Sequence, residues 1–189
     1  MNRKNRRRLH MYLRRKIDDY LTQWKNNENR YPLIIKGARQ IGKTESVKHF
    51  ADRNYESVVS INFALEKQFQ MILSDGYDVE NIIKNISLID PSKKFIANRT
   101  LIIFDELQEL PDIATSLKAF KLDGRFDVIC SGSLLGINYK KIHSNSVGYK
   151  TDYEMFSMDF EEFLWAKGYS ESHVNEMLEH MTTGKPFSE

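Results

Sequence analysis

Residues 37–44 read Gly-Ala-Arg-Gln-Ile-Gly-Lys-Thr, and this stretch decides the fold. It follows a short apolar run, Pro32–Ile35, which is typical of a buried strand. After it, Val47, Phe50 and Ala51 have the spacing of the buried face of a helix. Glycines let a backbone curl until successive N–H groups point at one anion, and the following helix adds its positive N-terminal end. The stretch therefore predicts a turn between a strand and a helix that holds a phosphate chain.

The last residues of this stretch supply the side chains that a nucleotide needs. The spacing Gly-x-x-x-x-Gly-Lys-Thr is that of a Walker A motif, or P-loop. Lys43 brings a positive charge to the β- and γ-phosphates, and the Thr44 hydroxyl is a ligand for Mg²⁺. We therefore expect ATP or ADP, bound with Mg²⁺, as ligands. The predicted nucleotide-binding residues are Gly37, Ala38, Arg39, Gln40, Ile41, Gly42, Lys43, Thr44 and Glu45.

A second motif places two carboxylates directly after an apolar strand. Leu101–Phe104 is wholly apolar and runs into Asp105 and Glu106. In open α/β sheets, ligands bind at the carboxyl ends of the strands, where this pair should lie. We expect Asp105 to hold Mg²⁺, directly or through water, as the Walker B acid does. Glu106 is then the base that orients and polarises the attacking water.

Polar residues also mark the ends of two other predicted strands. Asn62 ends the second strand and Ser133 follows the fourth, with Ser131 as the alternative to Ser133. Either side chain could hydrogen-bond Glu106, the γ-phosphate or the attacking water, and so sense whether ATP is intact. Polar residues at strand ends also serve as simple caps, so a structural role stays open for both.

The rest of the sequence alternates predicted strands with predicted helices. The expected strands are Pro32–Ile35, Ser57–Phe63, Leu101–Phe104, Phe126–Cys130 and, with weak alternation, Tyr153–Met158. Helical spacing is expected over about residues 9–25, 65–73 and 79–86, and after Pro111, Asp159 and Ser170. Strands that are apolar on both faces and alternate with helices predict an α/β fold with a mostly parallel sheet between helical layers.

Composition limits the class of protein. The 189 residues, 41% of them hydrophobic, suffice for one α/β domain, and no apolar run is long enough to cross a membrane. The basic start is not followed by the apolar core of a signal peptide. A single cysteine allows no internal disulfide, and the five histidines lack ligand spacing. We therefore expect a cytoplasmic protein without a transition-metal site.

The net charge of +2 hides an asymmetry along the chain. Residues 1–16 hold eight lysines or arginines and no acid, whereas the remaining residues have a formal charge of −6. Such a basic arm can bind nucleic acid or anionic lipid, but more often it is a solvated and partly frayed chain end. We favour the second interpretation and keep nucleic acid as an alternative partner.

Five segments, in this order, resemble the AAA+ superfamily of P-loop ATPases. They are GARQIGKT at 37–44, INF at 61–63, IIFDELQ at 102–108, ICSGSLLG at 129–136 and DFEEFLWAKG at 159–168. Over roughly residues 12–186 the chain is similar, more closely, to bacterial and archaeal predicted ATPases that carry an accessory domain after the ATPase core.

This resemblance implies a P-loop NTPase fold, which is a three-layer α/β/α sandwich around a five-stranded sheet in the order 5-1-4-3-2. It also implies that Asn62 is the switch partner of Glu106 and that Ser133 or Ser131 senses the γ-phosphate. The residues that it assigns to hydrolysis of ATP with Mg²⁺ are Lys43, Thr44, Asp105 and Glu106.

AAA+ proteins generally need an arginine that reaches the γ-phosphate, often from a neighbouring subunit, so the resemblance leaves self-association open. Related sequences often have an arginine or lysine in the stretch at residues 146–150, where this chain has Lys150. A lysine is a weaker donor there than a bidentate arginine. Arg39 and Arg125 are the other candidate cations.

Members of the resembled family extend well beyond the length of this chain, which is similar to their N-terminal part. We expect a basic arm and an amphipathic helix at residues 1–30 and the ATPase core at residues 31–168. Residues 169–189 are expected to form a C-terminal helix at the start of a missing C-terminal region.

Three functions are compatible with these residues. The first is a Mg²⁺-dependent ATPase whose hydrolysis drives a conformational change of unknown output. The second is a nucleotide-gated binding module with negligible hydrolysis, and the third is a nucleic-acid-associated ATPase that uses the basic arm. Gln108 either contacts the nucleotide-proximal network or is a surface residue at a helix start.

Overall fold

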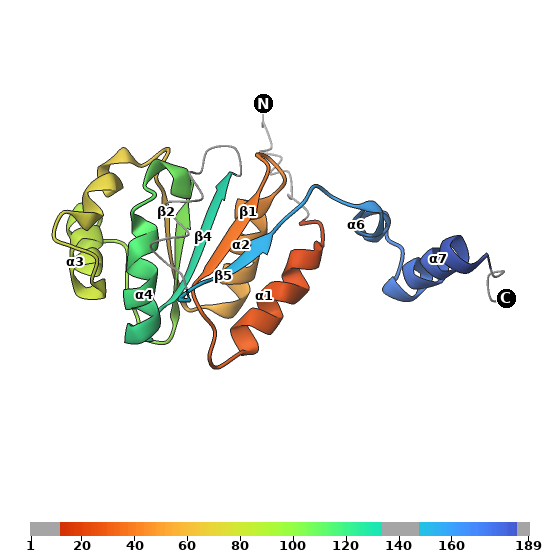
Figure 1. The fold of residues 1–189 in the computed structure, drawn as a ribbon, viewed down its shortest axis with the longest axis horizontal. Coiled ribbons are helices and arrows are strands. Elements are labelled where there is room, and N and C mark those ends of the chain that lie inside the picture. Colours follow the sequence, from red (N-terminus) through yellow and green to blue (C-terminus); the bar gives the residue numbers. More distant parts are fainter. Residues whose placement is uncertain (1–11, 134–147, 185–189) are drawn as a thin grey trace, which may run out of the picture. The chain divides into compact units, whose positions relative to one another are not determined.

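A computed structural model of the chain describes residues 12–133 and 148–184. The described residues form two compact units (Figure 1). One unit spans residues 17–157, and the other joins residues 12–16 to residues 158–184. The first unit contains the sheet, and the second contains the last two helices. The three-part division expected from the sequence stays a prediction.

Five strands form one parallel sheet in the first unit (Figure 1). Their spatial order is β2-β3-β4-β1-β5, and each neighbouring pair is parallel. The order predicted from the resemblance is confirmed, and the sheet is wholly rather than mostly parallel. The strands are β1 (Leu33–Gly37), β2 (Ser57–Asn62), β3 (Thr100–Asp105), β4 (Asp127–Ser133) and β5 (Thr151–Glu154).

Helices precede, join and follow these strands. The α-helices are α1 (Lys16–Asn26), α2 (Lys43–Asn54), α3 (Val79–Ile89), α4 (Ile113–Asp123), α6 (Phe160–Ala166) and α7 (Glu171–Thr183). Two 3₁₀ segments, η1 (Lys67–Leu73) and η2 (Leu107–Glu109), lie after β2 and β3.

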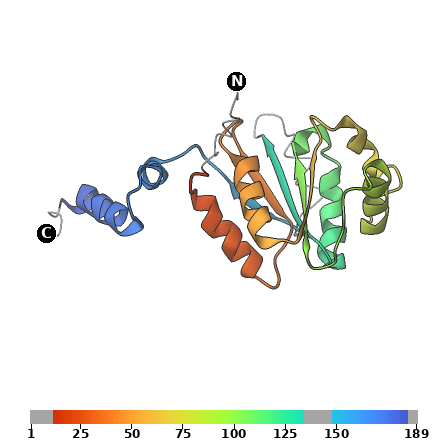
Figure 2. The same ribbon diagram turned by 180° about the vertical axis from the view of Figure 1, so that it is seen from behind.

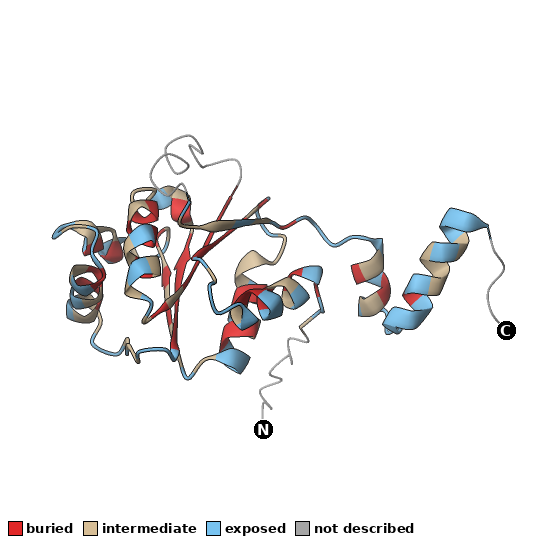
Figure 3. Cartoon of the chain, turned by 60° about the horizontal axis from the view of Figure 1, so that its bottom comes forward, coloured by how far each residue is buried: buried red, intermediate tan, exposed pale blue. Residues whose placement is uncertain are grey.

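Both faces of the sheet are covered, as the alternating side chains of β3 show. Ile102 and Phe104 pack into a core with α3, α4 and η1, whereas Leu101 and Ile103 pack into a second core with α1 and α2. All four side chains are fully buried. Figures 1 and 2 show the two helical layers from opposite sides, and Figure 3 shows buried residues along strands and on parts of the helices. The predicted three-layer sandwich is confirmed.

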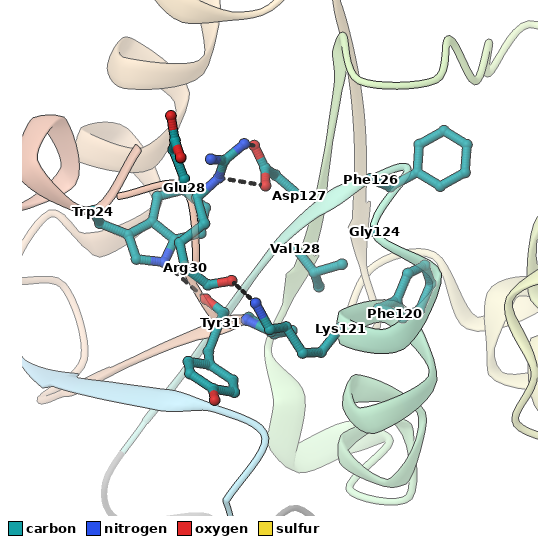
Figure 4. A pocket seen from close by; sticks show the side chains of 11 residues that line it. Trp24, Glu28, Arg30, Tyr31, Phe120, Lys121, Gly124, Phe126, Asp127 and Val128 are labelled. Carbon is teal, nitrogen blue, oxygen red and sulfur yellow. Dashed lines mark hydrogen bonds and ion pairs between the residues drawn. The ribbon is translucent and has the colours of Figure 1, made fainter. Parts of the chain in front are cut away.

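A small cavity of about 90 Å³ lies beside the starts of β1 and β4 (Figure 4). Arg30 donates through Nε and Nη2 to the two carboxylate oxygens of Asp127, at 2.7 and 2.9 Å. Tyr55 Oη donates to the same carboxylate at 2.7 Å. Trp24 and Lys121 donate to backbone carbonyls between α1 and β1. These hydrogen bonds connect α1, α2, α4 and the starts of β1 and β4, so the polar groups around the cavity have a structural role.

Replacing Asp127 by asparagine removes the negative charge that Arg30 and Tyr55 contact beside this cavity. We expect Asp127→Asn to lower the free energy of unfolding by about 1–3 kcal/mol, because Arg30 and Tyr55 lose their charged acceptor. Glu28→Gln is the matched control, since Glu28 is exposed beside the same cavity and surface changes usually stay within about 0.5 kcal/mol. Urea unfolding measures both variants, and equal stability of the two contradicts this role of Asp127.

The first helix begins later than predicted. Apolar spacing predicts a helix over residues 9–25, whereas residues 12–15 are not helical and α1 begins at Lys16. The first three positions of the predicted helix lie outside the described residues. Arg15 Nε lies 3.1 Å from Glu162 Oε1 of α6, and the Lys16 N–H donates to the same oxygen at 2.7 Å. These tertiary contacts override the local helical pattern.

Three other elements also differ from the prediction. The spacing at residues 65–73 predicts an α-helix, but the segment is the 3₁₀ turn η1, in which residues three apart share a face. The fifth strand is β5, which begins two residues earlier and ends four residues earlier than the alternation at residues 153–158 predicts. Strand β4 continues beyond its predicted end because Ser133 still pairs with Gly37 of β1.

The second unit has two capped helices. Asp159 and Glu162 form the predicted capping box of α6, and Ser170 caps α7 by accepting a backbone N–H. Arg14 lies over the ring of Trp165, at 4.6 Å from its centroid. The described end of the basic arm is therefore packed and not frayed, and the rest of the arm lies outside the described residues. Within the described ranges, no helix has the length and apolar character to cross a membrane.

Candidate nucleotide-binding site

The predicted motifs meet at the carboxyl edge of the sheet. Gly37, which ends β1, pairs in register with Ser133 of β4, and Asn62 of β2 pairs with Asp105 of β3. The glycine-rich loop leads from β1 into α2. A cleft of about 610 Å³ lies between the loop and the ends of β3 and β4. The predicted site residues that line it are Arg39, Gln40, Gly42, Lys43, Thr44, Glu45, Asp105, Glu106 and Ser133.

Two glycines shape the loop. Gly42, directly before α2, has a φ of 95°, a left-handed conformation that residues with a Cβ rarely adopt. At Gly37, a Cβ would lie 2.3 Å from the carbonyl oxygen of Met155, so the backbones approach this closely only without a side chain. The first turn of α2 begins at the cleft, and its N–H groups have no helical acceptors. The loop thus has the form of an anion site.

Lys43 is folded over the loop. Its Nζ donates to the carbonyl oxygens of Gly37 at 3.0 Å and Ala38 at 2.6 Å. Burial lowers the pKa of Lys43, and the nearby carboxylates of Glu106 and Asp105 partly offset this effect. The lysine of the first motif and the acids of the second are therefore neighbours, at the distance over which charges interact.

Asp105 is the centre of a hydrogen-bond network at the end of β3. The residue is only 4% exposed. Its Oδ2 accepts from Thr44 Oγ1 at 3.0 Å and from Asn62 Nδ2 at 3.1 Å. Its Oδ1 accepts from the Glu106 N–H at 3.0 Å and from the Ser131 hydroxyl. Donors from β2, β4, α2 and the residue directly after β3 therefore fix the orientation of this carboxylate.

The oxygens of Thr44 and Asp105 suit a magnesium ion. Mg²⁺ prefers an octahedron of oxygens at about 2.0–2.1 Å, so neighbouring ligands lie about 3 Å apart. Thr44 Oγ1 and Asp105 Oδ2 are 3.0 Å apart, and both residues line the cleft. The pair can supply adjacent ligands or hold metal-bound water, with phosphate oxygens and water in the remaining positions.

The contacts of Asn62 differ from those that the resemblance implies. Its Nδ2 donates to Asp105, and its Oδ1 accepts from the N–H groups of Ala64 and Leu65, each at 3.0 Å. The amide is thus engaged in the turn after β2 and in orienting Asp105. The role of Asn62 as the switch partner of Glu106 stays a prediction.

Glu106 follows β3 in a left-handed backbone conformation, with a φ of 57° and a ψ of 51°. Its Oε2 accepts a hydrogen bond from Gln108 Nε2. Gln108 therefore belongs to the cleft, a role that the sequence left open; its position two residues after the acidic pair was the available signal. Ser133 is 2% exposed, and its hydroxyl has no hydrogen-bond partner among the described residues. A buried hydroxyl without a partner marks a place for a ligand oxygen or water.

The three candidate cations lie in different places. Arg39 is exposed and lines the cleft. Arg125 pairs with acidic side chains beside the start of β4, at the other edge of the sheet. Lys150 directly precedes β5, which begins beside the start of β1 and not beside its carboxyl end. The Nζ of Lys150 pairs with Asp152. Within the described part of the chain, Lys150 and Arg125 are thus not brought to the cleft, and a role of Lys150 toward a second copy stays a prediction.

The fold and the cleft define a P-loop nucleotide-binding protein. A family model described as an AAA domain matches residues 29–164, which is more than half of the chain. The chain therefore belongs to this AAA family, and membership supports nucleotide binding and ATPase activity as the function of the core. No protein with a curated description matches the sequence.

Solved structures match the chain at low identity. Drosophila ORC bound to DNA matches at 15% identity and a TM-score of 0.43, over 74% of this chain and 89% of that chain. PCH-2 of C. elegans matches at 15% identity and a TM-score of 0.42, over 88% of this chain and 44% of that chain. The flagellar accessory protein FlaH of Methanocaldococcus jannaschii matches at 17% identity and a TM-score of 0.38, over 66% of this chain and 70% of that chain. Likenesses this distant carry no argument about function.

Proposed function

We propose that the cleft binds ATP with Mg²⁺ and that Glu106 activates water to hydrolyse the γ-phosphate. The observation that supports this most is the 3.0 Å distance between Thr44 Oγ1 and Asp105 Oδ2, which joins the two motifs. The charges of Glu106 and Asp105 also act on Lys43. A cleft of about 610 Å³ is within the range of small-molecule sites and has room for a triphosphate.

Each residue has a separate task in this proposal. Lys43 exchanges its loop carbonyls for oxygens of the β- and γ-phosphates, beside the positive end of α2. Thr44 and Asp105 hold Mg²⁺, which when bound neutralises charge on the phosphates. Glu106 accepts a proton from the attacking water. The Ser133 hydroxyl donates to the γ-phosphate or to that water.

A nucleotide-gated binding module with negligible hydrolysis is the second candidate. The position of Lys150 favours it, because its Nζ pairs with Asp152 and does not approach the phosphate loop. Among the described cations, Arg39 and Lys43 are those that line the cleft. In this candidate ATP binds and persists, and bound nucleotide controls which partner the chain contacts.

Substitution of Thr44 tests the magnesium part of the proposal. We expect Mg²⁺ to strengthen ATP binding to the wild type by roughly tenfold or more, a difference of about 1.4 kcal/mol. Thr44→Ala loses most of this gain because the hydroxyl ligand is gone, whereas the control Thr44→Ser keeps it. Calorimetric titration of ATP with and without Mg²⁺ measures both. Folded wild-type protein that gives no heat with ATP and Mg²⁺ overturns the proposed function.

A further inference from the structure

We propose that Gln108 is a positioning residue that holds Glu106 and links it to the end of β4, a role that rests on the proposed hydrolysis. Gln108 lies in η2, the short turn after β3, and lines the cleft. Its Nε2 donates to Glu106 Oε2, and its Oε1 accepts the Ser133 N–H at 3.3 Å. One side-chain amide thus joins the proposed base to the strand end that carries the unpaired hydroxyl.

The two partners dictate which way the Gln108 amide points. A carboxylate only accepts hydrogen bonds, and a backbone N–H only donates. Turning the amide by 180° would place its oxygen against the Glu106 carboxylate and its NH₂ group against the Ser133 N–H. Both contacts would be repulsive, so the observed orientation is the one that satisfies both ends. A residue that both accepts and donates at this spacing is therefore required.

Hydrogen bonds fix the backbone of Glu106, whereas its carboxylate needs a separate partner to fix its orientation. Its left-handed conformation is uncommon for a residue with a side chain, and two hydrogen bonds maintain it. The Glu106 N–H donates to Asp105 Oδ1 at 3.0 Å, and the Glu106 carbonyl accepts the Glu109 N–H at 2.9 Å. Gln108 then fixes Oε2 of the carboxylate. Within the described residues Oε1 has no hydrogen bond, so it is the oxygen that can accept a proton from water.

Asn62 does not hold Glu106 in this structure, and its role as switch partner stays a prediction. Its amide is engaged with Asp105 and with the turn after β2. Gln108 donates to Glu106, and its second partner is the backbone N–H of Ser133. When a phosphate oxygen accepts a hydrogen bond from the Ser133 hydroxyl, the ligand fixes the end of β4. Gln108 contacts both the Ser133 N–H and Glu106, so it transmits the position of this strand end to Glu106. The orientation of the base then depends on whether the γ-phosphate is present.

Two substitutions of Gln108 in the full chain separate this role from a structural one. We expect Gln108→Ala to lower kcat for ATP by roughly 10- to 100-fold, a part of the 10²–10⁴ that a positioned base contributes. KM and the Kd for ATP should stay within about twofold, because the phosphate contacts are unchanged. Gln108→Glu keeps the shape of the side chain but cannot donate to Glu106, and its charge repels the base. Its kcat should be as low as that of Gln108→Ala or lower.

A structural role gives the opposite order, because the isosteric Gln108→Glu preserves packing better than Gln108→Ala. Gln108→Glu with the higher kcat, or a wild-type kcat in either variant, overturns the proposal. If Gln108→Ala does not fold, the kcat of Gln108→Glu decides alone. Gln70→Ala is the matched control, since Gln70 donates to a backbone carbonyl at 3.4 Å outside the cleft and should leave kcat unchanged. Absence of turnover in the wild type overturns the proposed hydrolysis as well, whereas normal turnover of the variants beside an active wild type overturns only the role of Gln108.

Discussion

Lys43→Ala is expected to weaken ATP binding by about 10- to 150-fold, which corresponds to the roughly 1.5–3 kcal/mol of a hydrogen bond to a charged group. The Lys43 ammonium lies at the start of α2, partly buried and within reach of the loop. Removing it leaves Arg39 as the remaining cation among the described lining residues, and Arg39 is exposed. A flexible surface arginine cannot restore a charge placed between the β- and γ-phosphates.

Lys48→Ala is the matched control for this prediction. Lys48 lies on the same helix and is exposed outside the cleft, so its removal changes the net charge by the same amount. Calorimetry at one fixed ionic strength compares the two variants with the wild type. Thermal unfolding shows whether the freed carbonyls of Gly37 and Ala38 disturb the fold. Equal ATP affinity of Lys43→Ala and Lys48→Ala contradicts the assignment of the glycine-rich loop.

The sequence predicts the meeting of Thr44 and Asp105 although 61 residues separate them. Each motif alone is a local pattern: a glycine-rich turn after one strand, and an acidic pair after another. Parallel strands end at the same edge of a sheet, so two such patterns in one α/β chain lie along that edge, and the strand order decides how close they come. The strand order follows from the resemblance, and the register confirms that the two motifs end at the same edge.

Side-chain partners within the site could not be predicted in the same way. Ser131 and Ser133 are two residues apart in β4 and share one face, so sequence alone could not separate them. The structure separates them by contact, because Ser131 donates to Asp105 whereas the Ser133 hydroxyl is unpaired among the described residues. The hydrogen-bond partners of Asn62 and Gln108 likewise depend on the conformations of the turns after β2 and β3. Tertiary packing sets these conformations, so the sequence pattern does not predict them.

Glu106→Gln is expected to leave ATP affinity within about twofold and to lower hydrolysis by roughly 10²–10⁴, the usual contribution of a general base. The amide has the shape of the carboxylate and can still accept the hydrogen bond from Gln108. It cannot take a proton from water at neutral pH. Phosphate release measures the rate, and calorimetry with ATP and Mg²⁺ measures the affinity, so chemistry and binding are separated in one variant.

The control Glu56→Gln removes an exposed carboxylate near the start of β2, where Glu56 pairs with Arg99 at the opposite edge of the sheet from the cleft. Equal phosphate release by the wild type and Glu106→Gln contradicts the role of Glu106. Negligible release by the wild type, together with tight binding that Lys43→Ala abolishes, favours the nucleotide-gated module instead. The placement of Lys150 fits that result, because its Nζ pairs with Asp152 and, among the described residues, the exposed Arg39 is the cation that lines the cleft besides Lys43. A γ-phosphate that no second cation contacts leaves ATP bound but its transition state poorly stabilised.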